Sequence, residues 1–225
     1  MRSLCALSLF SLVVGCVAAK EEVGTRNDFV VYGNDDRVEV YQHPDPVWRE
    51  LAARSIVALV SSNILDTSNP SDVRFRGQNL QQARSLCPSE RFLEQPAIAN
   101  CSGTLIDLDL VLTAGHCVTS QAQCEGTSFV FDYLYEDDGP RKEIDLNEDV
   151  YGCSELVTQQ LVGGLDYAVV RLDRVVHEEH GPAPVRMGDE RLTLGTGLVV
   201  MGFGSGIPLK IDDGAKRAAE VAIGA

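Results

Sequence analysis

Residues 101–117, which read CSGTLIDLDLVLTAGHC, form the most informative segment of the sequence. Two apolar runs flank a polar break at residues 107–109, and this pattern predicts a β-hairpin. Cys101 and Cys117 stand at the two ends of the hairpin, and His116 follows a turn of small residues directly before the second cysteine. A disulfide between the cysteines would fix the backbone beside His116, which a general base needs if it is to hold one orientation.

A second informative stretch lies downstream, where residues 165–172 read LDYAVVRL. Asp166 opens an apolar run of strand length, so we expect its carboxylate to be partly buried. A buried carboxylate requires a partner, and the Nδ1–H of a histidine is a suitable donor. The sequence therefore predicts that His116 and Asp166 form a pair.

The combination of CSGTLI…VLTAGHC with LDYAVVRL resembles the trypsin-like serine peptidases, which fold as two antiparallel β-barrels with the active site between them. The resemblance implies that His116 is the catalytic histidine and Asp166 the aspartate that orients it. It also implies a disulfide Cys101–Cys117 that braces the histidine loop. No cofactor and no metal are expected.

Two further segments are similar to the bacterial glutamyl-endopeptidase-like branch of this family. They are residues 31–37, VYGNDDR, which match the mature N-terminus of that branch, and residues 202–210, GFGSGIPLK, which match the opening of the second barrel. The resemblance therefore runs from about residue 30 to about residue 214.

The nucleophile that this chemistry needs is missing from the sequence. In the family, the serine and the oxyanion-binding amides come from a G-[DN]-S-G-[GS] turn in the second barrel. The only serine after Asp166 is Ser205, which lies in the segment that matches the start of that barrel. We therefore expect an all-β double barrel whose first barrel is complete and whose second is incomplete.

Two functions remain open at this stage. The first is an exported serine endopeptidase by resemblance, inactive as this chain alone because the serine and the oxyanion hole are absent. The alternative is a non-catalytic pseudopeptidase that acts as a binding or inhibitory module.

The chain divides into four segments. The first is a signal peptide, or a lipoprotein signal that ends before Cys16, because the opening residues are one arginine, an apolar run and small residues. The expected segments are the signal (1–19), an N-terminal or propeptide-like segment (20–45), the first barrel (46–185, with a loop insertion at 61–96) and the start of a truncated second barrel (186–225).

The charge balance restricts the partners. The chain has 19 Lys and Arg against 33 Asp and Glu, a net charge of −14, and its hydrophobic content of 44% suffices for a core. An acidic surface disfavours binding to nucleic acid and to anionic membranes. The expected partner is a polypeptide substrate, with membrane attachment only through a lipid on Cys16. The expected location is secreted, periplasmic or lipid-anchored at the cell envelope.

Export to an oxidising compartment makes the remaining cysteines disulfide candidates. Cys124 and Cys153 are the next possible pair, which leaves Cys87 over. Cys87 could instead pair with Cys124 or Cys153, since the sequence does not settle the connectivity.

Three groups of residues resemble metal sites, but the sequence disfavours metal binding at each of them. The segment 177–180, HEEH, lacks the spacing of a zinc helix. A zinc set of His116 with Cys117, Cys124 and Cys153 is disfavoured in an exported chain. The acidic clusters at 35–36 and 136–138 are typical of turns.

Local patterns predict short strands and few helices. Short helical turns are expected at 48–53 and at 80–86, the latter with Asn79 as its N-cap. The expected strands beyond the hairpin are 55–60, 129–135, 150–157, 167–172 and 197–202.

Overall fold

The computed structural model describes residues 35–188 and 192–216. The predicted leader, Cys16 and most of the propeptide-like segment therefore lie outside the described residues. Over the two described ranges, no helix has the length and apolar character needed to cross a membrane.

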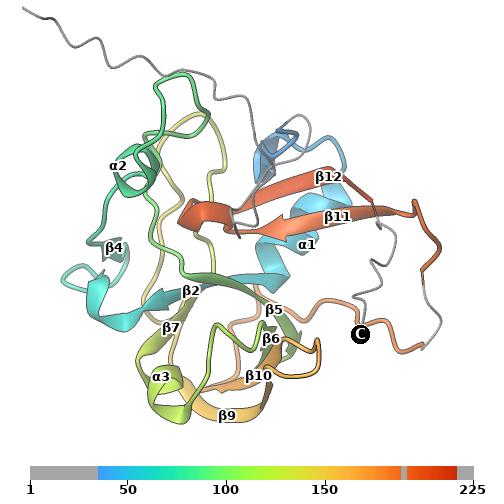
Figure 1. The fold of residues 1–225 in the computed structure, drawn as a ribbon. Helices are drawn as coiled ribbons and strands as arrows, with labels where there is room; N and C mark the ends of the chain where they lie inside the picture. Colours follow the sequence, from blue (N-terminus) through green and yellow to red (C-terminus); the bar gives the residue numbers. More distant parts are fainter. Residues whose placement is uncertain (1–34, 189–191, 217–225) are drawn as a thin grey trace, which may run out of the picture. The chain divides into compact units, whose positions relative to one another are not determined.

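The largest element is a curled sheet of seven antiparallel strands, ordered β8-β7-β2-β5-β6-β10-β9. Figure 1 shows β5, β6, β9 and β10 bending round together. This sheet confirms the predicted all-β class. Its strands are β2 (Ile56–Ser61), β5 (Cys101–Asp107), β6 (Leu110–Thr113), β7 (Thr127–Val130), β8 (Val150–Tyr151), β9 (Cys153–Gln160) and β10 (Tyr167–Leu172).

Hydrophobic patterning explains which face of this sheet is buried. In β10 every second residue is buried, so Ala168, Val170 and Leu172 share the inner face. Leu105 and Val111 of the β5–β6 hairpin are fully buried in the same core. β2 is central and almost wholly buried, as its run of apolar residues predicts.

A second sheet has three strands within the described residues, in the order β1-β12-β11. They are β1 (Val38–Glu39), β11 (Gly197–Gly202) and β12 (Lys210–Lys216). Glu39 of β1 lies opposite Lys210 of β12, and their side chains form a buried ion pair with Nζ 3.0 Å from Oε2. The strand β1 comes from the segment assigned to residues 20–45, so the end of that segment belongs to the second sheet.

The helices are short and each begins at a capping residue. Asp45 accepts a hydrogen bond from the amide of Val47 at the start of α1, and Asn79 accepts one from Gln82 at the start of α2. The α-helices are α1 (Pro46–Ser55), α2 (Leu80–Arg84) and α3 (Gln121–Glu125), and the 3₁₀ turns are η1 (Val40–Gln42), η2 (Ser62–Ile64) and η3 (Gly204–Gly206). The insertion at 61–96 holds α2 and a small two-stranded sheet, β3 (Leu65–Asp66) with β4 (Arg74–Phe75).

Two strand predictions were wrong in their bounds. The strand expected at 129–135 ends at Val130, because Asp132 has a φ of 57°, outside the extended region. The strand expected at 150–157 is divided at Gly152 into β8 and β9. At Gly152 the chain changes its partner, because β8 pairs with β7 and β9 pairs with β10.

The disulfide Cys124–Cys153 joins α3 to β9 across 29 positions of sequence. Replacing both cysteines by serine should lower the free energy of unfolding by about 3 kcal/mol, because the unfolded chain loses a loop constraint of this size. Chemical denaturation of the double variant measures this. The control is Ser71→Ala, since Ser71 is exposed and its hydroxyl makes no hydrogen bond within the described residues. A loss under about 0.5 kcal/mol would contradict the expectation.

Candidate active site

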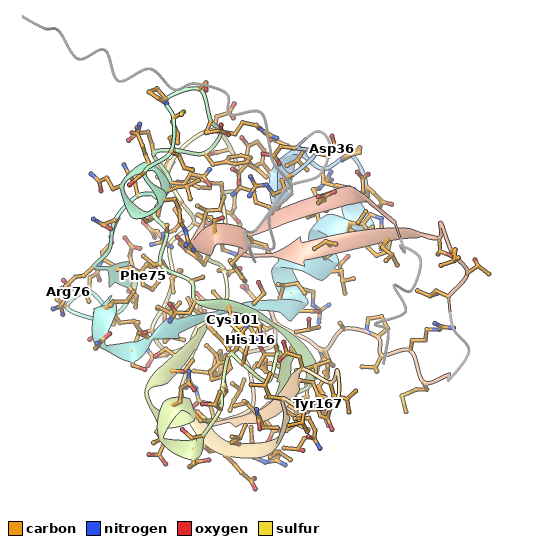
Figure 2. All side chains as sticks on the ribbon, in the orientation of Figure 1. Asp36, Phe75, Arg76, Cys101, His116 and Tyr167 are labelled. Carbon is orange, nitrogen blue, oxygen red and sulfur yellow. A yellow bond between two sulfur atoms is a disulfide. The ribbon has the colours of Figure 1, made fainter. Side chains whose placement is uncertain are left out.

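His116 stands on a tight turn directly after β6. The amide of Cys117 donates to the carbonyl of Ala114 at 3.0 Å and closes the turn. The disulfide Cys101–Cys117 ties the residue after His116 to the first residue of β5. Figure 2 shows Cys101 and His116 close together among the barrel strands. The turn is thus attached to the sheet on both sides of the histidine.

Asp166 immediately precedes β10 and faces His116. Its Oδ2 lies 2.7 Å from Nδ1 of the imidazole, and its Oδ1 accepts the backbone amide of His116 at 3.0 Å. Both carboxylate oxygens therefore hold the same residue, one through the ring and one through the backbone. The structure brings together the two residues that the sequence predicted as a pair.

This geometry fixes the form of the imidazole. The pKa of Asp166 is held below its usual value, chiefly by the hydrogen bond from the His116 side chain and then by the backbone amide of His116. An ionised carboxylate only accepts hydrogen bonds, so Nδ1 carries the hydrogen in this contact. Nε2 is then the nitrogen left to accept a proton, as in a general base oriented by a carboxylate.

The pair is open to solvent. The side chains of His116 and Asp166 are 61% and 43% exposed, so the carboxylate is less buried than the sequence analysis expected. An aspartate at the start of a strand is buried only if another segment of the chain packs over it, and no such segment is present among the residues described. A group from another molecule can therefore reach the side chains of His116 and Asp166 from solvent.

Ser205 does not complete the pair. It lies in η3 with a φ of 62°, next to Gly206, whose carbonyl accepts the amides of Ile98 and Ala99. Across the described ranges, no hydrogen bond connects Ser205 to His116.

The sequence analysis missed a buried polar cluster of Asp132, Asp149 and His180, whose ligand-type atoms lie within 4.8 Å of one another. His180 Nε2 is 2.9 Å from Oδ1 of Asp149, and Lys142 Nζ is 2.8 Å from Oδ2 of Asp132. Burial raises the pKa of Asp132. The three residues of the cluster are far apart in the sequence. Only the HEEH segment at 177–180, which contains His180, had suggested a group of this kind.

The other cysteines are also bonded. Cys124 is paired with Cys153, so neither is free to pair with Cys87 or to bind zinc. Cys87 is itself disulfide-bonded.

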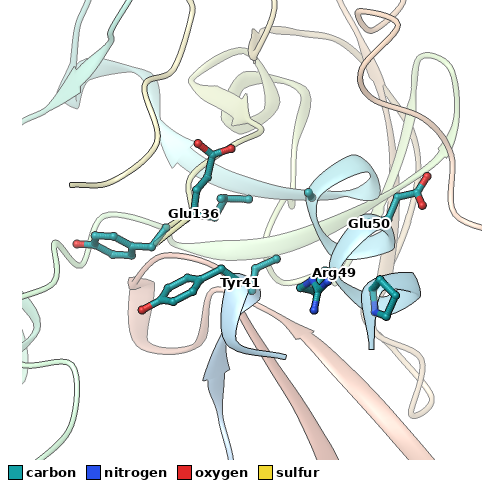
Figure 3. A pocket seen from close by; sticks show the side chains of 9 residues that line it. Tyr41, Arg49, Glu50 and Glu136 are labelled. Atoms are coloured by element: carbon teal, nitrogen blue, oxygen red, sulfur yellow. The ribbon is translucent and has the colours of Figure 1, made fainter. Parts of the chain in front are cut away.

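A shallow hollow of about 370 Å³ lies elsewhere, between α1, η1 and the segment 134–136. Figure 3 shows Tyr41, Arg49, Glu50 and Glu136 around it. The acidic turn 136–138 borders this hollow, because Glu136 lines it. Asp138 of the same turn accepts a hydrogen bond from the hydroxyl of Tyr41. His116 and Asp166 do not line this hollow, so it is separate from the pair.

The fold and the site together define the class: an all-β chain in which a disulfide-braced histidine is held by an aspartate at the start of a neighbouring strand. A family model described as Trypsin matches residues 86–219, more than half of the chain, and the chain belongs to this family. A comparison with curated proteins found no match. The family implies polypeptide substrates, and the two disulfides fit an exported protein.

Proposed function

We propose that this chain carries the histidine–aspartate half of a serine-endopeptidase active site. His116 would be the general base and then the general acid of acyl transfer, and Asp166 would orient it. The observation that carries the proposal is the 2.7 Å contact between Nδ1 of His116 and Oδ2 of Asp166, reinforced by the bond from the His116 amide. We further propose that the chain belongs to the glutamyl-endopeptidase-like branch of the family. The similarity of residues 31–37 and 202–210 to that branch supports this.

The nucleophile is not supplied by these 225 residues. Ser205 is the only serine after Asp166, it lies outside a G-[DN]-S-G turn, and it makes no hydrogen bond with His116 in the described part of the chain. Without an activated serine and an oxyanion hole, the histidine has no hydroxyl to deprotonate. We therefore propose that this chain alone does not hydrolyse peptide bonds.

We also propose that the protein is exported. The opening residues have the pattern of a signal peptide or a lipoprotein signal, and the two disulfides require an oxidising compartment to persist. A lipid on Cys16 would anchor the protein to the cell envelope.

The activity test uses the purified 225-residue chain with labelled casein and a set of fluorogenic peptides. Hydrolysis should equal that of the His116→Ala variant, and a fluorophosphonate probe for activated serines should label neither protein. The His177→Ala variant is the matched histidine control, since His177 is in a long 3.9 Å contact with Glu148 instead of the pair. Turnover that is lost in His116→Ala and kept in His177→Ala would overturn the proposed inactivity.

A further inference from the structure

A row of side chains crosses the inner face of the barrel beside the histidine turn. Ala168 of β10 lies opposite Thr113 of β6 on one side and Gln159 of β9 on the other. Residues directly opposite in antiparallel strands share one face of the sheet. Thr113 and Gln159 therefore flank a small, fully buried alanine.

Both polar members of this row bind backbone carbonyl groups. The hydroxyl of Thr113 donates to the carbonyl of Ser102 at 2.9 Å. The amide Nε2 of Gln159 donates to the carbonyl of Gly115 at 3.1 Å. Within the described part of the chain, the Gln159 side chain is the one donor to that carbonyl. Gly115 is the residue immediately before His116.

Gly115 packs directly on the end of the β9–β10 pair. A Cβ at this position would lie 2.2 Å from the carbonyl oxygen of Gln160 and 2.9 Å from that of Tyr167. The turn thus rests against the backbone of both strands, with no layer of side chains between. This contact sets the distance between the turn and the sheet. The hydrogen bonds to the polar atoms of the turn set its orientation.

Those groups come from two adjacent strands. Asp166, before β10, binds the amide and the ring of His116, while Gln159, near the end of β9, binds the carbonyl of Gly115. The two contacts act on opposite sides of one peptide bond, because the carbonyl of Gly115 and the amide of His116 belong to the same peptide unit. A peptide plane held on both sides cannot rotate without breaking one contact.

We infer that Gln159 is a positioning residue for His116. The inference rests on the proposed function only in so far as it concerns catalysis. Its amide fixes the orientation of the Gly115–His116 peptide and thereby keeps the imidazole on Asp166. Gln159 touches neither the ring nor any reacting group. Its loss should loosen the His116–Asp166 hydrogen bond while the barrel remains folded.

The test follows the hydrogen on Nδ1 of His116 by proton nuclear magnetic resonance of the ¹⁵N-histidine-labelled chain, so it needs no peptidase activity. Gln159→Met keeps the length of the side chain and removes the donor. We expect the Nδ1–H signal to exchange with water at least tenfold faster in this variant than in the parent chain. Gln160→Met is the matched control, since no hydrogen bond of its side chain is present in the described residues, and its rate should stay within twofold of the parent.

Gln159→Glu is the second variant in case the methionine disturbs folding, because it has the same shape and its ionised carboxylate cannot donate. It should show the same acceleration, with near-ultraviolet circular dichroism unchanged. Equal exchange in the parent and either folded Gln159 variant would overturn the inference. The ¹⁵N shifts of the His116 ring, read through its carbon-bound protons, report the pair separately. A neutral imidazole whose Nδ1 carries no hydrogen in the parent would overturn the proposed histidine–aspartate pair, so the two failures are distinct.

Discussion

Replacing Gly115 by alanine should lower the free energy of unfolding by about 3 kcal/mol, at the upper end of overpacking effects. The added Cβ would lie 2.2 Å from the carbonyl oxygen of Gln160, and this oxygen belongs to the backbone of a paired strand. A flexible side chain could move aside, but the end of β9 is held in its ladder with β10 and cannot. The turn must therefore rise from the sheet, which also separates His116 from Asp166.

Urea denaturation monitored by circular dichroism measures the loss. Gly126→Ala is the matched control, because a Cβ there would meet its nearest atom, the carbonyl oxygen of Ala122, at an ordinary 3.6 Å. We expect the control to change stability by less than about 0.5 kcal/mol. Equal stability of the two variants would show that the turn does not rest on the strand ends as described.

The second large effect concerns Lys210, which should make the protein more stable as the pH rises from 8 to 10.5. Burial lowers the pKa of Lys210 from 10.5 to about 8, despite the opposing attraction of Glu39. Between these two pH values the unfolded chain binds a proton that the folded chain has released, so the free energy of unfolding increases with pH. The difference in pKa corresponds to about 3 kcal/mol.

Other groups also titrate in this range, so the measurement is the difference between the parent chain and Lys210→Met. The difference between their free energies of unfolding should change by about 3 kcal/mol between pH 7.5 and pH 11. The exposed pair Glu50–Arg54 offers a control, since its side chains are 70% and 48% exposed. Arg54→Met should give a difference that does not vary with pH, and a flat difference for Lys210→Met would refute the prediction.

The sequence was most informative where one local motif specifies both a shape and a chemistry. The hairpin at 101–117 and the strand at 167–172 lie where they were expected, and the helix at 80–84 begins at the predicted cap, Asn79. The pair of His116 and Asp166 was predicted from the local sequence, the family resemblance implied its roles, and the structure places the two side chains in contact. Their catalytic role stays a prediction.

The rest depends on contacts between distant parts of the chain. The positive φ of Asp132, which ends β7 early, is not visible in an apolar run. The role of Gln159 depends on the register of β9 against β10, which includes a shift that no residue pattern announces. The cluster of Asp132, Asp149 and His180 forms only once three segments have packed, so it could not be predicted from any one of them.

The pairing of β1 with β12 has a consequence for how the protein is made. Glu39 and Lys210 are separated by 171 positions, so β1 leaves the ribosome long before its partner strand exists. The seven strands of the large sheet are all synthesised in that interval. Closing so long a loop is entropically costly and slows folding. The second sheet can therefore assemble only after β12 has been synthesised, and until then β1 has no partner in β12.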